Sequence, residues 1–368
     1  MSLEFFWRLP VDGDGRSLRE DLWNRGDYNR LHTHQHQFAR TGSKRDGYSY
    51  YNHLSQIARA AELAGFSGLT IPQSASGEEP LIVAGAFARE VRRLTLLPAL
   101  PAHFLSAVYA AKIAVSFQRL TTGRLAWHLV TEDPGAGAWH GHNWSVVEQV
   151  ARADEFLDVA KGFWNEAPFT YHGRYYEVEN GGFAGALSAQ PFPTVYLSGD
   201  TPEALALSAK HADVHILSLD TPGAVTSRIA TLDALAAGHG RTLKFALQAD
   251  IVARYSDEAA WTQVRRLWDE FGEKTAGLPT AVVLPRDPQT LGSGHNLWRG
   301  LDFIQPGRGA SLVGGYEALA DRFEEYRTLG IDTFILSANP HLEEAYRIGE
   351  QLLPLVRSRA RLSVSEAA

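Results

Sequence analysis

The stretch TVYLSGDTPEALA, residues 194–206, contains a strand, a turn and the start of a helix in that order. An apolar, β-prone run at 194–197 leads into the turn Ser198-Gly199-Asp200-Thr201, and Pro202 stands where a first helical residue is expected. A helix start of this kind presents unbonded backbone N–H groups and the positive end of the helix dipole, which suits an anion such as phosphate. The alternative is an ordinary helix cap, with Asp200 or Thr201 as the capping residue.

Strand and helix patterns of the same kind alternate about eight times along the 368 residues. Strands are expected at 3–9, 68–71, 94–97, 124–130, 194–197, 214–218, 244–253 and 333–336, with a hairpin at 169–178. Helices are expected at 50–63, 80–91, 106–120, 145–164, 202–211, 222–237, 257–271, 316–329 and 342–356. Such alternation implies parallel strands joined by right-handed crossovers, and this number of units predicts a (β/α)8 TIM barrel. An open doubly wound sheet is disfavoured, because the first strand lacks a Gly-rich dinucleotide turn.

We expect one domain over residues 1–368, with insertion loops at 16–47 and 273–310 that are rich in polar residues, Gly or Pro. Hydrophobic residues make up 45% of the chain and charged residues 21%, which is typical of a globular protein. A net charge of −7 without a long basic run argues against nucleic acid and anionic membranes as partners. The absence of cysteine excludes disulfides and thiolate sites, and no signal peptide or spanning segment is recognised, so a cytoplasmic location is expected.

Three side chains are candidates for chemistry because the loops after the strands form the active face of a barrel. Asp12 follows the first strand in a Gly-flanked turn, and is either a local turn residue or a carboxylate over the barrel mouth. His128 lies near the end of the fourth strand, as an active-site or a core histidine. Asp250 interrupts an apolar run, and is a base, a substrate hydrogen-bond acceptor or the partner of a cation, unless it pairs structurally with a buried Arg. No metal site is predicted, since His32, His34 and His36 lie in a polar loop.

Several longer pieces resemble one known family. They are LEFFWRLPVDGDGR near the start, GRLAWHLVTE, NLWRG, and LVGGYEALADRFEEYRTLGIDTFILSANPHLEEAYRIGEQLLP near the end. Together they are similar to the alkanesulfonate monooxygenase branch of the bacterial luciferase-like flavin monooxygenases, almost from end to end, with gaps at 16–47 and 273–295.

The resemblance implies a TIM barrel that receives reduced FMN (FMNH2) from a separate NAD(P)H-dependent FMN reductase, and that uses O2 to form a C4a- or N5-peroxide of the flavin that attacks the substrate. It implies that Ser198, Gly199, Asp200 and Thr201 hold the FMN phosphate, and that His128 and Thr131 line the flavin site. It also suggests a homo-oligomer.

The chain departs from the sulfonate enzymes at several positions of the substrate site. The family's His before the first Gly-Asp-Gly is Asp12 here, its Cys after the second strand is Gly77, and its Arg-x-His on the seventh strand is Gln248-x-Asp250. Its mobile-loop Arg is Gln305, with Arg308 three residues later. Its Tyr after the eighth strand is Asn339, and its Tyr in the helix after strand four is Val150. Cationic positions have become neutral or acidic, so a sulfonate loses charge-assisted donors that are each worth roughly 1.5–3 kcal/mol. A substrate that is neutral, cationic or rich in hydroxyl or amide groups fits Asp12, Gln248, Asp250, Gln305 and Asn339 better. The expected substrate-binding residues are Gln248, Gln305, Arg308 and Asn339.

Four functions remain open. The first is a two-component FMNH2-dependent monooxygenase with a small organic substrate that is not a simple alkanesulfonate. The second is true desulfonation, with Arg308 or an Arg of the 16–47 loop replacing the lost cations. The third is a non-catalytic flavin-binding homologue, and the fourth is a deazaflavin-dependent oxidoreductase.

Overall fold

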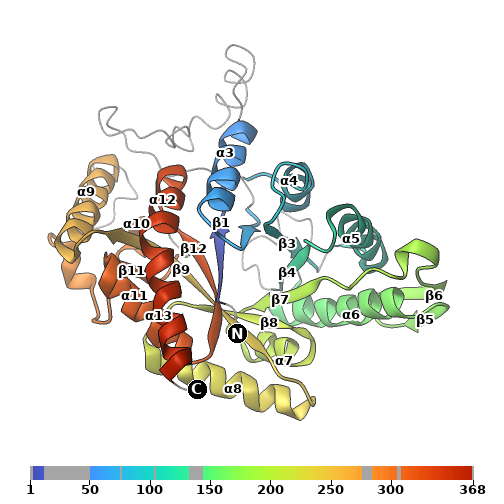
Figure 1. Ribbon diagram of the computed structural model, residues 1–368. Coiled ribbons are helices and arrows are strands. Elements are labelled where there is room, and N and C mark those ends of the chain that lie inside the picture. The colour runs from blue at the N-terminus through green and yellow to red at the C-terminus, as the bar shows by residue number, and fades with distance from the viewer. Residues whose placement is uncertain are drawn as a thin grey trace. The chain divides into compact units, whose positions relative to one another are not determined.

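The computed structural model describes residues 3–11, 50–74, 77–102, 105–131, 144–275, 284–304 and 308–366 (Figure 1). Asp12, Gln305 and the whole insertion at 16–47 lie outside these ranges. Within the described residues, no helix combines the length and the apolar character needed to cross a membrane. The chain divides into two compact units, formed by residues 1–67, 218–227 and 246–368, and by residues 68–217 and 228–245.

Parallel strands and helices alternate along the chain, so the predicted (β/α)8 barrel is confirmed. The barrel strands are β1 (Glu4–Arg8), β2 (Gly68–Ile71), β3 (Thr95–Pro101), β4 (Ala126–Val130), β7 (Thr194–Ser198), β8 (Val214–Ser218), β9 (Lys244–Arg254) and β12 (Ile331–Ser337). The hydrogen-bonded order is β12-β1-β2-β3-β4-β7-β8, with β9 paired to both β12 and β8. This order returns to its starting strand, as a barrel requires.

The first unit contains β1, β9 and β12 with the helices α3 (Tyr50–Leu63), α9 (Asp257–Thr275), α11 (Tyr316–Thr328), α12 (His341–Arg347) and α13 (Leu353–Glu366). The last helix pattern was expected to be continuous over 342–356. Instead, one π-helical turn, Ile348–Leu352, separates α12 from α13. Gly349 lies in this turn, where a Cβ atom would overlap Ala64, so the glycine allows a close approach to the end of α3.

The described part of the insertion at 273–310 contains regular elements, which its Gly- and Pro-rich composition does not predict. It contains β10 (Leu297–Trp298), which pairs antiparallel with β11 (Ser311–Gly315), and the short helix α10 (Leu301–Ile304). Trp298 is fully buried and packs edge-on against Trp261 and Trp268 of α9, at ring distances of 6.5 and 5.9 Å. Burial of these aromatic rings gives the insertion its own small core, which sequence composition does not reveal.

The second unit contains β2, β3, β4, β7 and β8 with the helices α4 (Pro80–Phe87), α5 (Ala107–Thr121), α6 (Val146–Asn165), α7 (Pro202–His211) and α8 (Pro222–Gly238). The expected hairpin is present as β5 (Phe169–His172) and β6 (Glu177–Gly181), beside the long helix α6 (Figure 1). Gly162 of α6 leaves room for the ring of Phe169, which explains how the hairpin packs so closely on the helix.

Alternation along β1 and β12 determines which side chains face the helices. Phe5 contacts Phe323 of α11 and Phe334 of β12, with ring centroids 6.2 and 5.8 Å apart, while Trp7 contacts His341 of α12 at 5.7 Å. Because successive side chains of a strand point to opposite faces, Arg8 at the end of β1 faces away from these helices.

Candidate functional site

The turn between β7 and α7 has the helix-start geometry that the sequence predicts. Thr201 is the N-cap residue, and its side-chain oxygen accepts a hydrogen bond from the Ala204 N–H at 3.3 Å. Pro202 is the first helical residue, and Gly199 has a φ of 121°, which an L side chain rarely adopts. The predicted alternatives for this turn, cap and anion site, are compatible, because the cap occupies one N–H group of the first turn and leaves others open.

Asp200 does not stand alone in this turn. Its carboxylate forms an ion pair with the guanidinium of Arg228 on α8. The Asp200 side chain is 60% exposed and that of Arg228 is 37% exposed, so both groups remain within reach of solvent or a ligand. Arg228 supplies the cation that the sequence argument lacked, and it offsets the repulsion that Asp200 alone would exert on a phosphate.

His128 of β4 and Ser198 of β7 are brought together, with 3.0 Å between His128 Nε2 and Ser198 Oγ. Strand register explains the contact, because His128 pairs with Tyr196 and Leu129 with Leu197 on the neighbouring strand. Thr131, the next predicted flavin residue, has a buried hydroxyl group without a hydrogen-bond partner among the described residues. A buried hydroxyl of this kind is expected to bind a ligand or water, since leaving it unsatisfied costs about 1–3 kcal/mol.

These features fit the phosphate tail of FMN at the β7–α7 turn. The turn offers a helix N-terminus, a glycine that permits close backbone approach and the guanidinium of Arg228. Nearby on β8, His215 is fully buried, and burial lowers the pKa of its imidazole to about 4, so this ring is neutral and adds no charge to the site.

In the first unit, Asp250 of β9 lies among polar and cationic side chains. Arg308 Nη1 is 3.4 Å from Asp250 Oδ1, and the Ser337 side chain at the end of β12 also forms a hydrogen bond with this carboxylate. Burial raises the pKa of Asp250 to about 6, while the nearby Arg8 and the bond from Ser337 act in the opposite direction. Desolvation therefore outweighs attraction to the cations, as is common for buried ion pairs.

The remaining predicted substrate residues form few side-chain contacts with the described residues. Gln248 is half-buried on β9, and its backbone carbonyl accepts a hydrogen bond from the Leu219 N–H at 3.1 Å. Asn339 follows β12, and its side-chain oxygen is buried without a hydrogen-bond partner among the described residues. Asp12 and Gln305, the other two predicted residues, lie outside the described part of the chain, and their roles stay predictions.

Three residues of these clusters were missed by the sequence argument, namely Arg8, Arg228 and Ser337. Arg8 carried a usable signal, because it is the one charge inside the apolar run FFWRL at 5–9. Arg228 and Ser337 carried none, since each meets its partner only through folding: Arg228 lies in α8, after an intervening strand and loop, and Ser337 lies on a strand remote in sequence from Asp250.

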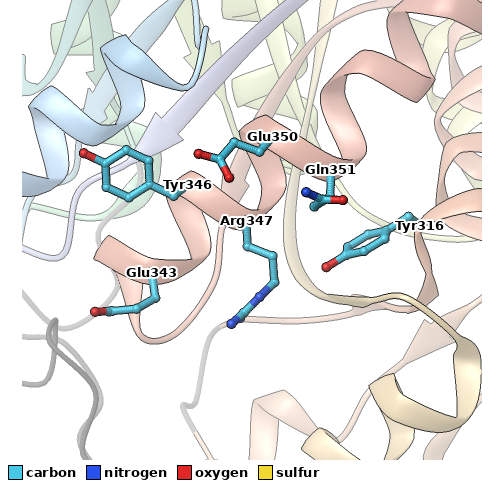
Figure 2. Close-up of a pocket in the computed structure, with 6 residues that line it drawn as sticks. All are labelled: Tyr316, Glu343, Tyr346, Arg347, Glu350 and Gln351. Atoms are coloured by element: carbon cyan, nitrogen blue, oxygen red, sulfur yellow. The ribbon is translucent and has the colours of Figure 1, made fainter.

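Outside these clusters, a cavity of about 440 Å³ lies beside the N-terminus of α11 and along α12 (Figure 2). Its wall is formed by Tyr316, Glu343, Tyr346, Arg347, Glu350 and Gln351, and Arg347 projects from α12 toward Tyr316. None of the predicted site residues that the structure describes is among those that line this cavity. The Asp250 cluster, which contains a buried titratable group, is therefore a better candidate for the active site than this cavity.

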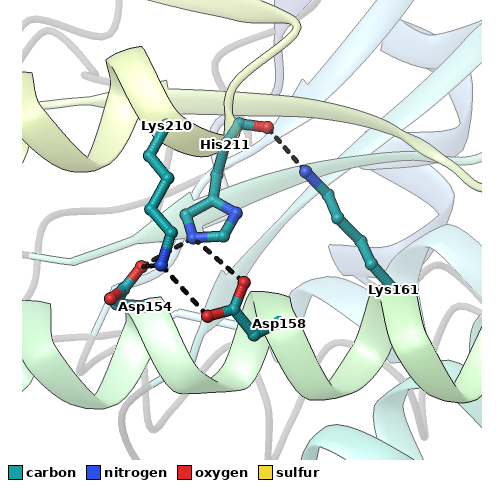
Figure 3. A network of polar contacts seen from close by, with 5 residues as sticks. All are labelled: Asp154, Asp158, Lys161, Lys210 and His211. Atoms are coloured by element: carbon teal, nitrogen blue, oxygen red, sulfur yellow. Dashed lines mark hydrogen bonds and ion pairs between the residues drawn. The ribbon is translucent and has the colours of Figure 1, made fainter. Parts of the chain in front are cut away.

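A second polar cluster joins α6 to α7 (Figure 3). Asp154, Asp158 and His211 have side-chain atoms close enough to bind one metal ion, but the ammonium of Lys210 already lies 2.7 Å from Asp154 and 3.0 Å from Asp158. A hydrogen bond from His211 is the main reason why the pKa of Asp154 falls to about 2, and burial lowers the pKa of His211. The cluster links α6 to α7 through ion pairs in which Lys210 supplies the positive charge.

Residues 31–333 match the family model described as luciferase-like monooxygenase. Among solved structures, EDTA monooxygenase (EmoA) from Chelativorans sp. BNC1 is 16% identical, with a TM-score of 0.70 over 98% of this chain and 95% of that chain. Riboflavin lyase (RcaE), with a modified FMN and riboflavin, is 17% identical, with a TM-score of 0.72 over 98% and 92%. DmoA from Hyphomicrobium sulfonivorans is 17% identical, with a TM-score of 0.69 over 98% and 88%. Identities at this level establish a common fold.

Proposed function

Because the chain belongs to the luciferase-like monooxygenase family, we propose that it is a two-component enzyme that uses FMNH2 and O2 to oxygenate a small organic substrate other than a simple alkanesulfonate. A separate NAD(P)H-dependent FMN reductase would supply the reduced flavin. A cytoplasmic location, a homo-oligomeric state and a single-domain organisation belong to the same proposal.

In this proposal the flavin is held by the second unit. The β7–α7 turn, from Ser198 to Thr201, and the guanidinium of Arg228 would bind the phosphate, while His128 and Thr131 would contact the rest of the cofactor. When bound, reduced FMN supplies the electrons for activation of O2. The protein contributes binding, orientation and exclusion of water.

The observation that carries the choice of substrate is the contact between Asp250 and Arg308. The desulfonation alternative relies on Arg308, or on an Arg of the 16–47 loop, as a free cation, but a buried carboxylate already lies 3.4 Å from the Arg308 guanidinium. Asp250 has an exposed fraction of 9%, so the carboxylate that already engages Arg308 is desolvated and cannot readily be exchanged for a sulfonate. With a pKa of about 6, Asp250 is instead suited to accept or donate a proton near neutral pH.

The direct test supplies FMNH2 enzymatically and follows flavin reoxidation by stopped-flow absorbance, together with O2 uptake and H2O2 release. We expect the protein to change the reoxidation rate and, with an accepted substrate, to reduce the H2O2 formed per O2 consumed. The reductase alone and a reduced deazaflavin serve as controls. Reoxidation at the free-solution rate, with every O2 recovered as H2O2 across a substrate panel, would contradict the proposal.

Short alkanesulfonates belong in the same panel, because sulfite release would establish the desulfonation alternative. Tight binding of oxidised FMN without any substrate-linked O2 consumption would instead favour a flavin-binding protein without catalysis.

A further inference from the structure

A cation that takes part in no described ion pair stands at the end of β1. Arg8 is half-buried, and its guanidinium has no hydrogen bond or ion pair with any residue that the structure describes. Strand register aligns Trp7 with Leu336, which places Arg8 beside Ser337 on the face opposite Phe5 and Trp7.

The described groups near Arg8 compensate its charge only in part. Asp250 is the carboxylate whose titration Arg8 influences, but Asp250 also receives the contacts of Arg308 and Ser337. Among the described residues, His341 of α12 is a second titratable neighbour; burial and the charge of Arg8 lower the pKa of this imidazole, so it is uncharged and adds no positive charge beside Arg8. One carboxylate is thus shared between two guanidinium groups.

We propose that Arg8 binds a carboxylate group of the substrate, and that Asp250 accepts a hydrogen bond from a hydroxyl or amide N–H group on the same molecule. The substrate class is then a small hydroxy- or amido-carboxylic acid. This inference rests on the proposed monooxygenase function. It keeps the hydroxyl or amide groups expected from the sequence but replaces a neutral or cationic substrate with one that carries a carboxylate, because the substitution pattern alone omitted Arg8.

Guanidinium geometry favours a carboxylate over a sulfonate here. The planar fork of one arginine matches the two oxygens of a carboxylate, so a single residue can make two parallel charge-assisted bonds. A tetrahedral sulfonate has a third charged oxygen, which would remain without a cationic partner at a site where Arg308 is already engaged by Asp250.

The test measures binding by calorimetry to the full-length protein, without reduced flavin or O2. The probes are glycolate, acetate, methanesulfonate and inorganic phosphate, and the variants are Arg8→Leu, Arg8→Lys and, as a matched control, Arg228→Leu. We expect glycolate to bind more tightly than acetate, and acetate more tightly than methanesulfonate. Arg8→Leu should weaken glycolate at least tenfold and Arg8→Lys by less, since lysine keeps the charge but loses the fork. Arg228→Leu should weaken phosphate and leave glycolate unchanged.

Equal glycolate binding in Arg8→Leu and the parent protein, no saturable carboxylate binding, or methanesulfonate binding as tight as acetate would overturn the assignment. Circular dichroism establishes that each variant is folded, and a misfolded Arg8→Leu leaves Arg8→Lys to decide by whether its glycolate affinity falls. Because the binding test requires no O2 and no reduced flavin, its failure is distinguishable from failure of the flavin reoxidation test.

Discussion

Asp200 and Asp250 are both paired with an arginine, but the two pairs lie in different surroundings. The side chains of Asp200 and Arg228 are 60% and 37% exposed, whereas those of Asp250 and Arg308 are 9% and 17% exposed. Water screens the first pair, so a ligand phosphate can exchange for Asp200 at little cost. The second pair is desolvated, and its carboxylate keeps a raised pKa although a cation is in contact. The proposed function therefore gives the same two residue types different roles: the exposed pair would exchange with a ligand, and the buried carboxyl group would titrate near neutral pH.

The largest expected difference between the two pairs is in turnover. Asp250→Asn keeps the size of the side chain and removes its proton chemistry, so we expect the rate of substrate oxygenation to fall about 10²- to 10⁴-fold. Asp200→Asn, the matched change at the exposed pair, should leave the rate at saturating FMN nearly unchanged. Substrate-dependent O2 uptake measures both. Similar rates in the two variants would remove the distinction on which the proposed role of Asp250 depends.

The second expected difference between the two pairs is in how the free energy of unfolding depends on pH. Folding raises the pKa of Asp250 from 3.8 to about 6, so the folded protein holds this proton more tightly than the unfolded chain. The resulting stability is fully present below pH 3.8 and is lost as the pH rises through about 6. A shift of this size corresponds to roughly 3 kcal/mol of unfolding free energy.

Urea unfolding between pH 4 and pH 8 checks this expectation. Asp250→Asn should abolish this part of the pH dependence and be more stable than the parent protein at pH 8, whereas Asp200→Asn should keep it. A loss of stability in Asp250→Asn at pH 8 would mean that attraction between Asp250 and its arginines exceeds the desolvation penalty.

Flavin affinity tests the exposed pair directly. Arg228→Leu removes the cation at the β7–α7 turn, and we expect FMN to bind about 10- to 100-fold more weakly, the loss of one charge-assisted contact. Riboflavin lacks the phosphate and should bind the variant and the parent protein equally. Fluorescence titration with both flavins separates the two cases, and an equal loss for riboflavin would place the phosphate away from Arg228.

The smallest expected effect concerns the helix cap beside Asp200. Thr201→Ala removes the side-chain oxygen that accepts from the Ala204 N–H, and should lower the free energy of unfolding by about 1 kcal/mol. Ser106→Ala, which removes the corresponding cap of α5, is the matched control and should have a similar effect on stability. Only Thr201→Ala should also weaken FMN binding, because it lies in the proposed phosphate turn. Equal flavin affinity in the two variants would assign Thr201 to the cap alone.

Only part of the candidate site at the β7–α7 turn could be predicted from the sequence. Ser198, Thr201 and Pro202 were recognisable because a helix start is built from neighbours in the chain. His128 and Ser198 come from different strands, and only their register brings them within 3.0 Å. Arg228 could not be inferred, since nothing near it in the sequence marks it as the partner of Asp200.

The sequence by itself determined the alternation of strands and helices, the capped turn at 198–201 and the family, because these depend on local propensities, periodicity and contiguous motifs. Tertiary structure alone decided which arginine meets which carboxylate, that Arg8 and Ser337 share a face, and that residues 284–304 pack with β9, α9 and β11 in a small core. The physical reason is that burial and charge pairing depend on groups brought together across long sequence separations. Desolvation at Asp250 shows the difference most clearly, because the chemistry of a carboxyl group changes with its surroundings while the sequence letter does not.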